Sequence, residues 1–233
     1  YWFGNGWVFF AEADAGHNAH TSFDVCSHEF AHGVTESLCP ILVNAGPPLS
    51  ILYLTYAGAI DEHLSDAFAT FSERRKVSET GQPAEHWWLF GEEVTRTPKL
   101  GPLALPPEGP PPPLALRSLS YPNSLGCADH RFEFIVDEDA IYYDSGVLSK
   151  FLYLWVKGGI HPDAHSRWRQ VPGMKQVLGN EEWAFLVAEQ VYYKMLRGRY
   201  LDKHCNLIEF REGLLRTIDT DLMMGPNTSR LRG

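Results

Sequence analysis

Residues 27–35 read Ser27-His28-Glu29-Phe30-Ala31-His32-Gly33-Val34-Thr35 and contain the pattern H-E-x-x-H. An α-helix turns by about 100° per residue, so side chains four positions apart return to nearly the same side. His28 and His32 can therefore place two imidazole nitrogens on one Zn²⁺. Glu29 follows the first histidine, where it can take a proton from water near the metal without binding the metal itself.

The surrounding residues favour an α-helix. Ser22 can cap its first turn, Asp24 places a negative charge there, and Phe30, Val34 and Leu38 form an apolar stripe. The five-residue pattern also arises by chance in amphipathic helices, and two histidines do not complete a zinc site. A third ligand is therefore needed.

A second predicted helix, residues 58–68, supplies that third ligand. Glu62 completes a His₂Glu set that leaves one position open, which is typical of catalytic zinc, whereas structural sites are closed by four protein ligands. Asp66 lies one turn after Glu62 and can accept the free N–H of a ligand histidine. Asp61, beside Glu62, is assigned the same orienting role. The alternative interpretation is a solvated acidic helix face.

These segments resemble the thermolysin-like neutral zinc metallopeptidases. The resemblance implies a mainly α fold, the helical C-terminal domain of a zincin of the gluzincin type, with a short β or irregular remnant at its N-terminal end. The motifs that carry it occur in the family's order: HEFAHGVTE at 28–36, GAIDEHLSDAF at 58–68, WLFGE at 88–92, ALRSLSYP at 115–122 and DSG at 144–146.

The resemblance also predicts the organisation of the chain. Residues 1–20 correspond to a remnant of the family's β-rich N-terminal domain and include its substrate-side edge strand. Residues 21–78 hold the zinc-binding helices, and residues 79–143 form a loop-rich connection with a Pro-rich insertion at 99–113. Residues 144–233 form a helical bundle. Since most of the β-rich domain has no counterpart here, we expect exposed apolar surface on the remainder.

Apolar spacing predicts local structure in both end regions. Val8, Phe9 and Phe10 read as a short strand. Three C-terminal helices follow from the helical period. Their predicted inner faces are Leu148, Phe151, Leu152 and Trp155 in 145–156; Trp183, Leu186, Val187 and Val191 in 181–195, capped by Asn180; and Leu207, Phe210, Leu214 and Ile218 along a last helix that runs from about 202 to about 217.

The resemblance implies peptide-bond hydrolysis. Glu29 is then the general base, and Tyr53 matches the family's tyrosine that donates to the oxyanion. Arg117 matches an arginine that binds a substrate carbonyl. Tyr142 occupies the place of the family's second donor, a histidine. A phenol can donate a hydrogen bond but stays neutral, and losing one oxyanion donor costs on the order of 10²–10³ in rate.

Three apolar residues correspond to the family's S1′ pocket, namely Val25, Phe90 and Leu116. They imply cleavage before a bulky apolar residue, although each could equally belong to the core.

Calcium is a separate question. Asp24, Glu73 and Glu92 match ligands of the family's double-calcium site, but Trp87 and Leu89 replace two acidic ligands. Ca²⁺ needs six to eight oxygen ligands. We therefore expect the full double site to be absent.

Composition limits the partners. The 233 residues carry a net charge of −9, which argues against a nucleic-acid partner. No run of 18 apolar residues occurs, so we expect no membrane span, and no signal peptide is visible. We expect a monomer that acts on peptides or proteins, and the resemblance implies secretion. The four cysteines, Cys26, Cys39, Cys127 and Cys205, could form two disulfides or remain thiols.

Four functions remain to be distinguished. The sequence favours a zinc-dependent endopeptidase. Its rivals are a catalytically impaired or inactive relative that keeps zinc and binds peptides or proteins, a different zincin such as an aminopeptidase, and a helical scaffold without metal.

Overall fold

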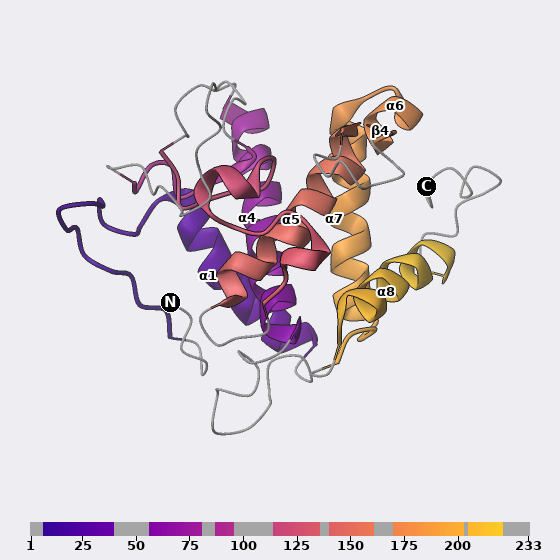
Figure 1. The fold of residues 1–233 in the computed structure, drawn as a ribbon, viewed down its shortest axis with the longest axis horizontal. Helices are drawn as coiled ribbons and strands as arrows, with labels where there is room; N and C mark the ends of the chain where they lie inside the picture. Colours follow the sequence, from indigo (N-terminus) through magenta and orange to yellow (C-terminus); the bar gives the residue numbers. More distant parts are fainter. Residues whose placement is uncertain are drawn as a thin grey trace.

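The computed structural model describes residues 7–39, 56–80, 87–95, 114–135, 140–160, 170–202 and 205–220. The fold is mainly α, as the sequence predicts (Figure 1). Its helices are α1 (Phe23–Leu38), α4 (Tyr56–Thr80), α5 (Ile141–Lys157), α6 (Met174–Leu178), α7 (Glu181–Arg197) and α8 (Leu207–Thr220), with short 3₁₀ turns η1 (Pro122–Leu125) and η2 (Arg131–Glu133).

Two antiparallel pairs of short strands accompany the helices. β1 (Leu89–Phe90) pairs with β2 (Arg117–Ser118), so that Phe90 lies opposite Arg117. β3 (Gly159–Ile160) pairs with β4 (Gln170–Val171). The first pair matters for the site because it brings Arg117 beside the zinc-pattern helices.

Helix α4 is the centre of the fold. It packs along α1 on one side and contacts α5 on another, and Figure 1 shows these helices crossing in the middle of the molecule. From Ala57 to Ala67 every residue of α4 is buried. Further along the core, Phe185, Tyr192 and Phe210 are almost fully enclosed where α7 and α8 meet α4. A long buried helix of this kind can hold polar side chains only if they are bonded to neighbours.

Of the predicted apolar stripe of α1, only Leu38 packs against the core. Phe30 is 61% exposed and Val34 is 39% exposed. Polar bonds from His28 and His32 to α4 fix the rotation of α1, and Phe30 lies on the far side. Ser22 stands at the N-cap as predicted, but its hydroxyl donates to the Asp24 carboxylate rather than capping a backbone N–H. The buried face carries Asp24, Val25, His28, Ala31 and Thr35.

Other local predictions have mixed outcomes. Asn180 caps α7 through a 2.7 Å bond from the Glu182 N–H, as predicted. Trp183 is nevertheless 60% exposed, because Ala184, Phe185 and Ala188 hold the inner face of α7. On α5, Leu148 and Leu152 are buried while Phe151 is 38% exposed; the inner face of α8 is confirmed at Phe210, Leu214 and Ile218.

The first described residues form no strand between 7 and 20, contrary to prediction. Val8 and His17 make isolated bridges, the latter to Thr95. Phe9 is 57% exposed and Trp7 is 66% exposed.

All four cysteines are free thiols. Among the helices that the structure describes, none is both long and apolar enough to cross a membrane. Tyr53 and the Pro-rich insertion at 99–113 lie outside the described residues.

Candidate metal centre

Helices α1 and α4 bring three potential metal ligands together. His28 and His32 stand one turn apart on α1, and their Nε2 atoms are 3.1 Å apart. Glu62 on α4 faces both rings, with carboxylate oxygens 3.3 Å from His28 Nε2 and 3.7 Å from His32 Nε2. The three side chains form a group that could hold a metal ion.

These separations can be compared with zinc coordination. Ligands about 2.1 Å from a tetrahedral centre lie about 3.4 Å from one another. The observed values of 3.1, 3.3 and 3.7 Å bracket that figure. One Glu62 oxygen, Oε2, is also buried without a hydrogen-bond partner. A buried carboxylate oxygen is costly when it is left without a donor or a cation, so the donor set fits a divalent ion.

The other ring nitrogens of both histidines face α4. His28 Nδ1 lies 2.9 Å from an Asp66 oxygen, and His32 Nδ1 lies 2.9 Å from an Asp61 oxygen. The Ser65 hydroxyl is 3.0 Å from His32 Nδ1 as well. In a neutral imidazole, a carboxylate at Nδ1 holds the proton there, so the Nε2 lone pair is directed toward the point between the rings. The helical spacing explains this pattern, since Asp61 and Ser65, like Glu62 and Asp66, are one turn apart.

Arg117 adds a cation behind His28. Its Nε and Nη2 donate to the two oxygens of Asp66, at 2.7 and 2.5 Å. The guanidinium also lies 4.2 Å from the centre of the Phe90 ring and 5.3 Å from that of Tyr142. This bidentate pair is largely buried, so the Arg117 side chain is held in one orientation.

The buried charges depend on one another. Burial alone would lower the pKa of His32, but the Asp61 carboxylate outweighs it and raises that pKa to about 9. Burial would likewise lower the pKa of His28, and Asp66 raises it overall. Burial would raise the pKa of Glu62, yet the histidines lower it. The carboxylates thus stabilise positive charge on the imidazoles and in the space between them. A bound metal cation would place positive charge in that same space.

The structure describes two of the predicted catalytic residues besides Arg117, namely Glu29 and Tyr142. Glu29 is half-buried on α1 and acts electrostatically on His32. Tyr142 is the second residue of α5 and is 45% exposed, with Arg117 over its ring. Tyr53 lies outside the described residues, so the structure places only one of the two predicted tyrosines.

Of the three residues assigned to a substrate pocket, Phe90 and Leu116 are neighbours, and Val25 belongs to the same hydrophobic core. Phe90 and Val25 are 4% and 5% exposed and belong to the core, and Leu116 packs against it. The Phe90 ring lies 4.9 Å from that of His28, and the Leu116 N–H donates to the Phe90 carbonyl at 2.7 Å. Phe90 and Leu116 form an apolar wall beside His28 and Arg117.

The carboxylates compared with calcium ligands also converge. Asp24 accepts from the backbone N–H groups of Val25 and Gly91. Glu73 and Glu92 each have a buried oxygen without a hydrogen-bond partner. Burial, together with the other carboxylates, raises the pKa of Glu73 to about 8 and that of Glu92 to about 7. The absence of the full double site stays a prediction.

Sequence reasoning missed two polar residues of α4. Ser65 was not assigned, although its position four residues after Asp61 was the available signal. His63 also lies outside the predicted set. It is fully buried, with Nε2 2.8 Å from the Tyr192 hydroxyl and Nδ1 3.3 Å from the Ser149 hydroxyl, and burial lowers its pKa to about 3. His63 is a neutral core residue, on the face of α4 that packs against α5 and α7.

Comparison with known proteins gives a consistent picture. The model of the thermolysin metallopeptidase α-helical domain matches residues 50–223, a range that includes Glu62 and begins after α1. Bacillolysin from Bacillus cereus is 30% identical over 141 residues, which cover 59% of this chain and 20% of that protein. An extracellular metalloprotease from Pectobacterium carotovorum is 27% identical over 145 residues, which cover 57% of this chain and 35% of that protein.

A solved structure shows the same fold. The precursor of protealysin, a metalloproteinase from Serratia proteamaculans, superposes with a TM-score of 0.63 at 22% identity. The match covers 96% of this chain and 59% of that one. The chain therefore spans only part of the length of the proteins it matches, about a fifth in the case of bacillolysin.

Proposed function

Because this chain belongs to the thermolysin metallopeptidase family through its α-helical domain, we propose that it is a zinc-dependent endopeptidase. The observation that supports this most strongly is the convergence of His28, His32 and Glu62, with donor atoms 3.1–3.7 Å apart. Zinc held by these side chains would supply a Lewis acid for a peptide carbonyl and would lower the pKa of bound water toward 7.

The neighbouring side chains have distinct roles in this proposal. Asp66 and Asp61 hold the Nδ1 protons of His28 and His32, so that both rings present Nε2 to the metal. Glu29 takes the proton of the attacking water and delivers it to the leaving nitrogen. Its place next to His28 on α1 keeps its carboxylate near the metal without making it a ligand.

The substrate carbonyl develops negative charge as water attacks. Arg117 stays charged and is oriented by Asp66, so it can donate to a substrate carbonyl without rearranging. Tyr142 and Tyr53 provide the neutral O–H donors for the oxyanion. Tyr142 is supported by its position beside Arg117, whereas Tyr53 is supported by sequence alone.

The apolar wall beside His28 suggests the preferred substrate. Val25, Phe90 and Leu116 would receive the side chain that follows the scissile bond, so cleavage is favoured before bulky apolar residues. Peptides or proteins are the substrates, and the enzyme acts as a monomer. Secretion is part of the proposal, since a relative is described as extracellular.

One observation favours a second candidate, a zinc-binding relative with little or no activity. Tyr142 stands where the resemblance places a histidine, and its phenol cannot become a cation near neutral pH. Such a protein would still bind zinc and capture peptides along the same wall.

Zinc content and peptide hydrolysis, measured on the same sample, test the proposal. We expect one zinc per chain and turnover of an N-blocked dipeptide with leucine after the scissile bond, abolished by a chelator. Glu29→Gln should keep the zinc and lose on the order of 10²–10⁴ in rate. Glu36→Gln, on the same helix, is the matched control and should keep its rate.

The other outcomes identify the rivals. Full zinc occupancy without turnover would establish the inactive relative. Cleavage only of substrates with a free N-terminus would indicate an aminopeptidase. A protein that retains no zinc after dialysis would be a scaffold without metal.

A further inference from the structure

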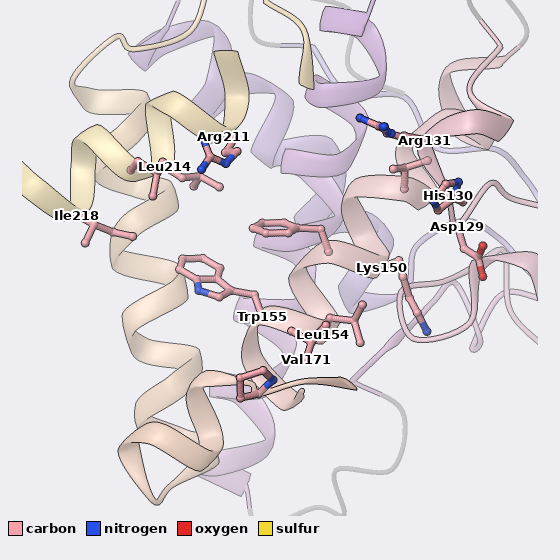
Figure 2. A pocket seen from close by; sticks show the side chains of 14 residues that line it. Asp129, His130, Arg131, Lys150, Leu154, Trp155, Val171, Arg211, Leu214 and Ile218 are labelled. Atoms are coloured by element: carbon pink, nitrogen blue, oxygen red, sulfur yellow. The ribbon is translucent and has the colours of Figure 1, made fainter. Parts of the chain in front are cut away.

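We propose that a cavity between α5 and α8, separate from the metal centre, binds an amphipathic carboxylate such as a medium-chain fatty acid. The cavity has a volume of about 430 Å³, which lies in the range of small-molecule sites. Figure 2 shows its walls, formed by α5 on one side and α8 on the other, with β4 and the η2 turn at its edges. None of the three potential metal ligands lines it.

The interior of the cavity is apolar. Phe151 and Trp155 project from α5, with their rings stacked at 5.8 Å between centres, and Leu214 and Ile218 face them from α8. Phe151 is 38% exposed although it belongs to the wall of this cavity. Leu214 and Ile218 are themselves buried, so the exposed ring of Phe151 and the partly buried ring of Trp155 are the surfaces that an apolar ligand would cover.

The charged groups at the cavity are mostly basic. In Figure 2, Arg131 from η2 and Arg211 from α8 extend from opposite walls. Lys150 contributes only its stem, because its ammonium donates to the Ser120 carbonyl at 2.5 Å. Asp129 interacts electrostatically with Lys150 and so offsets that charge. The two arginines are therefore the groups left to meet a ligand's charge, and a guanidinium binds a carboxylate through two parallel hydrogen bonds.

The present contacts of these arginines are exchangeable. Arg211 pairs with Glu212, but both side chains are at least 60% exposed, and exposed pairs contribute little. Arg131 lies over the ring of its neighbour Phe132, which is 77% exposed. Among the residues that the structure describes, neither guanidinium has a buried partner like the one that Asp66 provides for Arg117. A ligand carboxylate can replace these contacts at low cost, while its chain enters the apolar space.

Calorimetric titration with saturated fatty acids, below their aggregation concentrations, tests the proposal. We expect one saturable site for decanoate. Affinity should rise about fourfold for each added methylene from octanoate to dodecanoate, because burying one methylene group contributes about 0.8 kcal/mol to the binding free energy. Decanol, which has the same chain without the charge, should bind at least about fivefold more weakly. EDTA should leave decanoate binding unchanged, because the site is not the metal centre.

Matched substitutions locate the site. Val147 lines the cavity on α5, and Val147→Phe should fill it and lower decanoate affinity at least tenfold. Val177→Phe, on α6, is the control and should bind normally. Arg131→Gln combined with Arg211→Gln should remove the preference for decanoate over decanol. Arg216→Gln, on α8 and over the Tyr200 ring, should not.

Several results would overturn the proposal. They are the absence of saturable decanoate binding, loss of binding on chelation, or an unchanged decanoate affinity in both Val147→Phe and the double arginine variant. Decanoate that dissociates a dimer in sedimentation would assign the cavity to a second copy of this chain instead. If Val147→Phe does not fold, as judged by circular dichroism, the arginine pair decides alone.

Discussion

Asp66 Oδ1 lies 2.9 Å from Nδ1 of His28 and also accepts a hydrogen bond from Arg117 Nη2, while Asp66 Oδ2 accepts one from Arg117 Nε. One side chain of α4 therefore ties a potential metal ligand on α1 to a cation on β2. Its proposed role in orienting His28 and its role in neutralising Arg117 can be separated by substitution.

Asp66→Asn removes the negative charge and nearly preserves the shape. We expect zinc affinity, measured by chelator competition, to fall by about 10–100-fold, because losing the carboxylate that orients a ligand histidine typically weakens metal binding by that factor. The free energy of unfolding should fall by about 3 kcal/mol, since Arg117 is left as a buried, unpaired charge. Asp14→Asn, at an exposed aspartate, is the control for both measurements.

Adding Arg117→Met to Asp66→Asn separates the two roles. The double variant no longer buries an unpaired cation, so stability should recover in urea unfolding while zinc affinity stays low. Recovery of both quantities together would show that Asp66 acts only as the counter-charge of Arg117.

Tyr142→His should raise the rate of peptide hydrolysis, on the order of tenfold, because an imidazolium stabilises an oxyanion better than a neutral phenol. The variant should fold normally, since Tyr142 is 45% exposed. The pH–rate profile should gain a descending limb near pH 6.5, where the new imidazole loses its proton. An unchanged or lower rate would argue against placing Tyr142 at the oxyanion.

Stability in the presence of chelator should fall as pH rises through 7 to 8. The pKa values of Glu73 and Glu92 are raised by burial to about 8 and about 7. The folded protein therefore holds more protons than the unfolded chain between about pH 4.5 and 8, and stability declines over that interval. Both carboxylates are partly exposed and screened, so the loss should be on the order of 2 kcal/mol.

Glu73→Gln checks this assignment, because it removes the ionisation and keeps the shape. Urea unfolding at pH 5.5, 7.0 and 8.5 should give a flatter pH dependence than in the unmodified protein. Glu189→Gln, at a carboxylate that is already paired with Arg75, should leave the slope unchanged. A wild-type slope in Glu73→Gln would contradict the account.

The ligand geometry was accessible from the sequence because helical spacing is a local property. The four-residue interval of His28 and His32 already places two rings on one side of α1, and the positions of Glu62 and Asp66 do the same on α4. The polar contacts of His28 with Asp66 and of His32 with Asp61 then follow, because charged groups buried between two helices must be paired.

Other features depend on contacts that spacing does not reveal. Phe30 and Val34 read as an inner stripe, but the polar bonds of His28 and His32 decide which way α1 faces. Trp183 reads as a core residue, yet the small side chains of Ala184 and Ala188 occupy the buried face of α7 and Trp183 is left exposed. The cavity between α5 and α8 arises from residues some 60 positions apart, and no local period encodes its shape.

The most direct test of the metal centre is anomalous diffraction at the zinc edge, on crystals of protein purified without chelator. The account predicts one zinc peak about 2.1 Å from Nε2 of His28, Nε2 of His32 and a carboxylate oxygen of Glu62. Diffraction that shows no peak between these three atoms, in protein containing one zinc per chain, would contradict it.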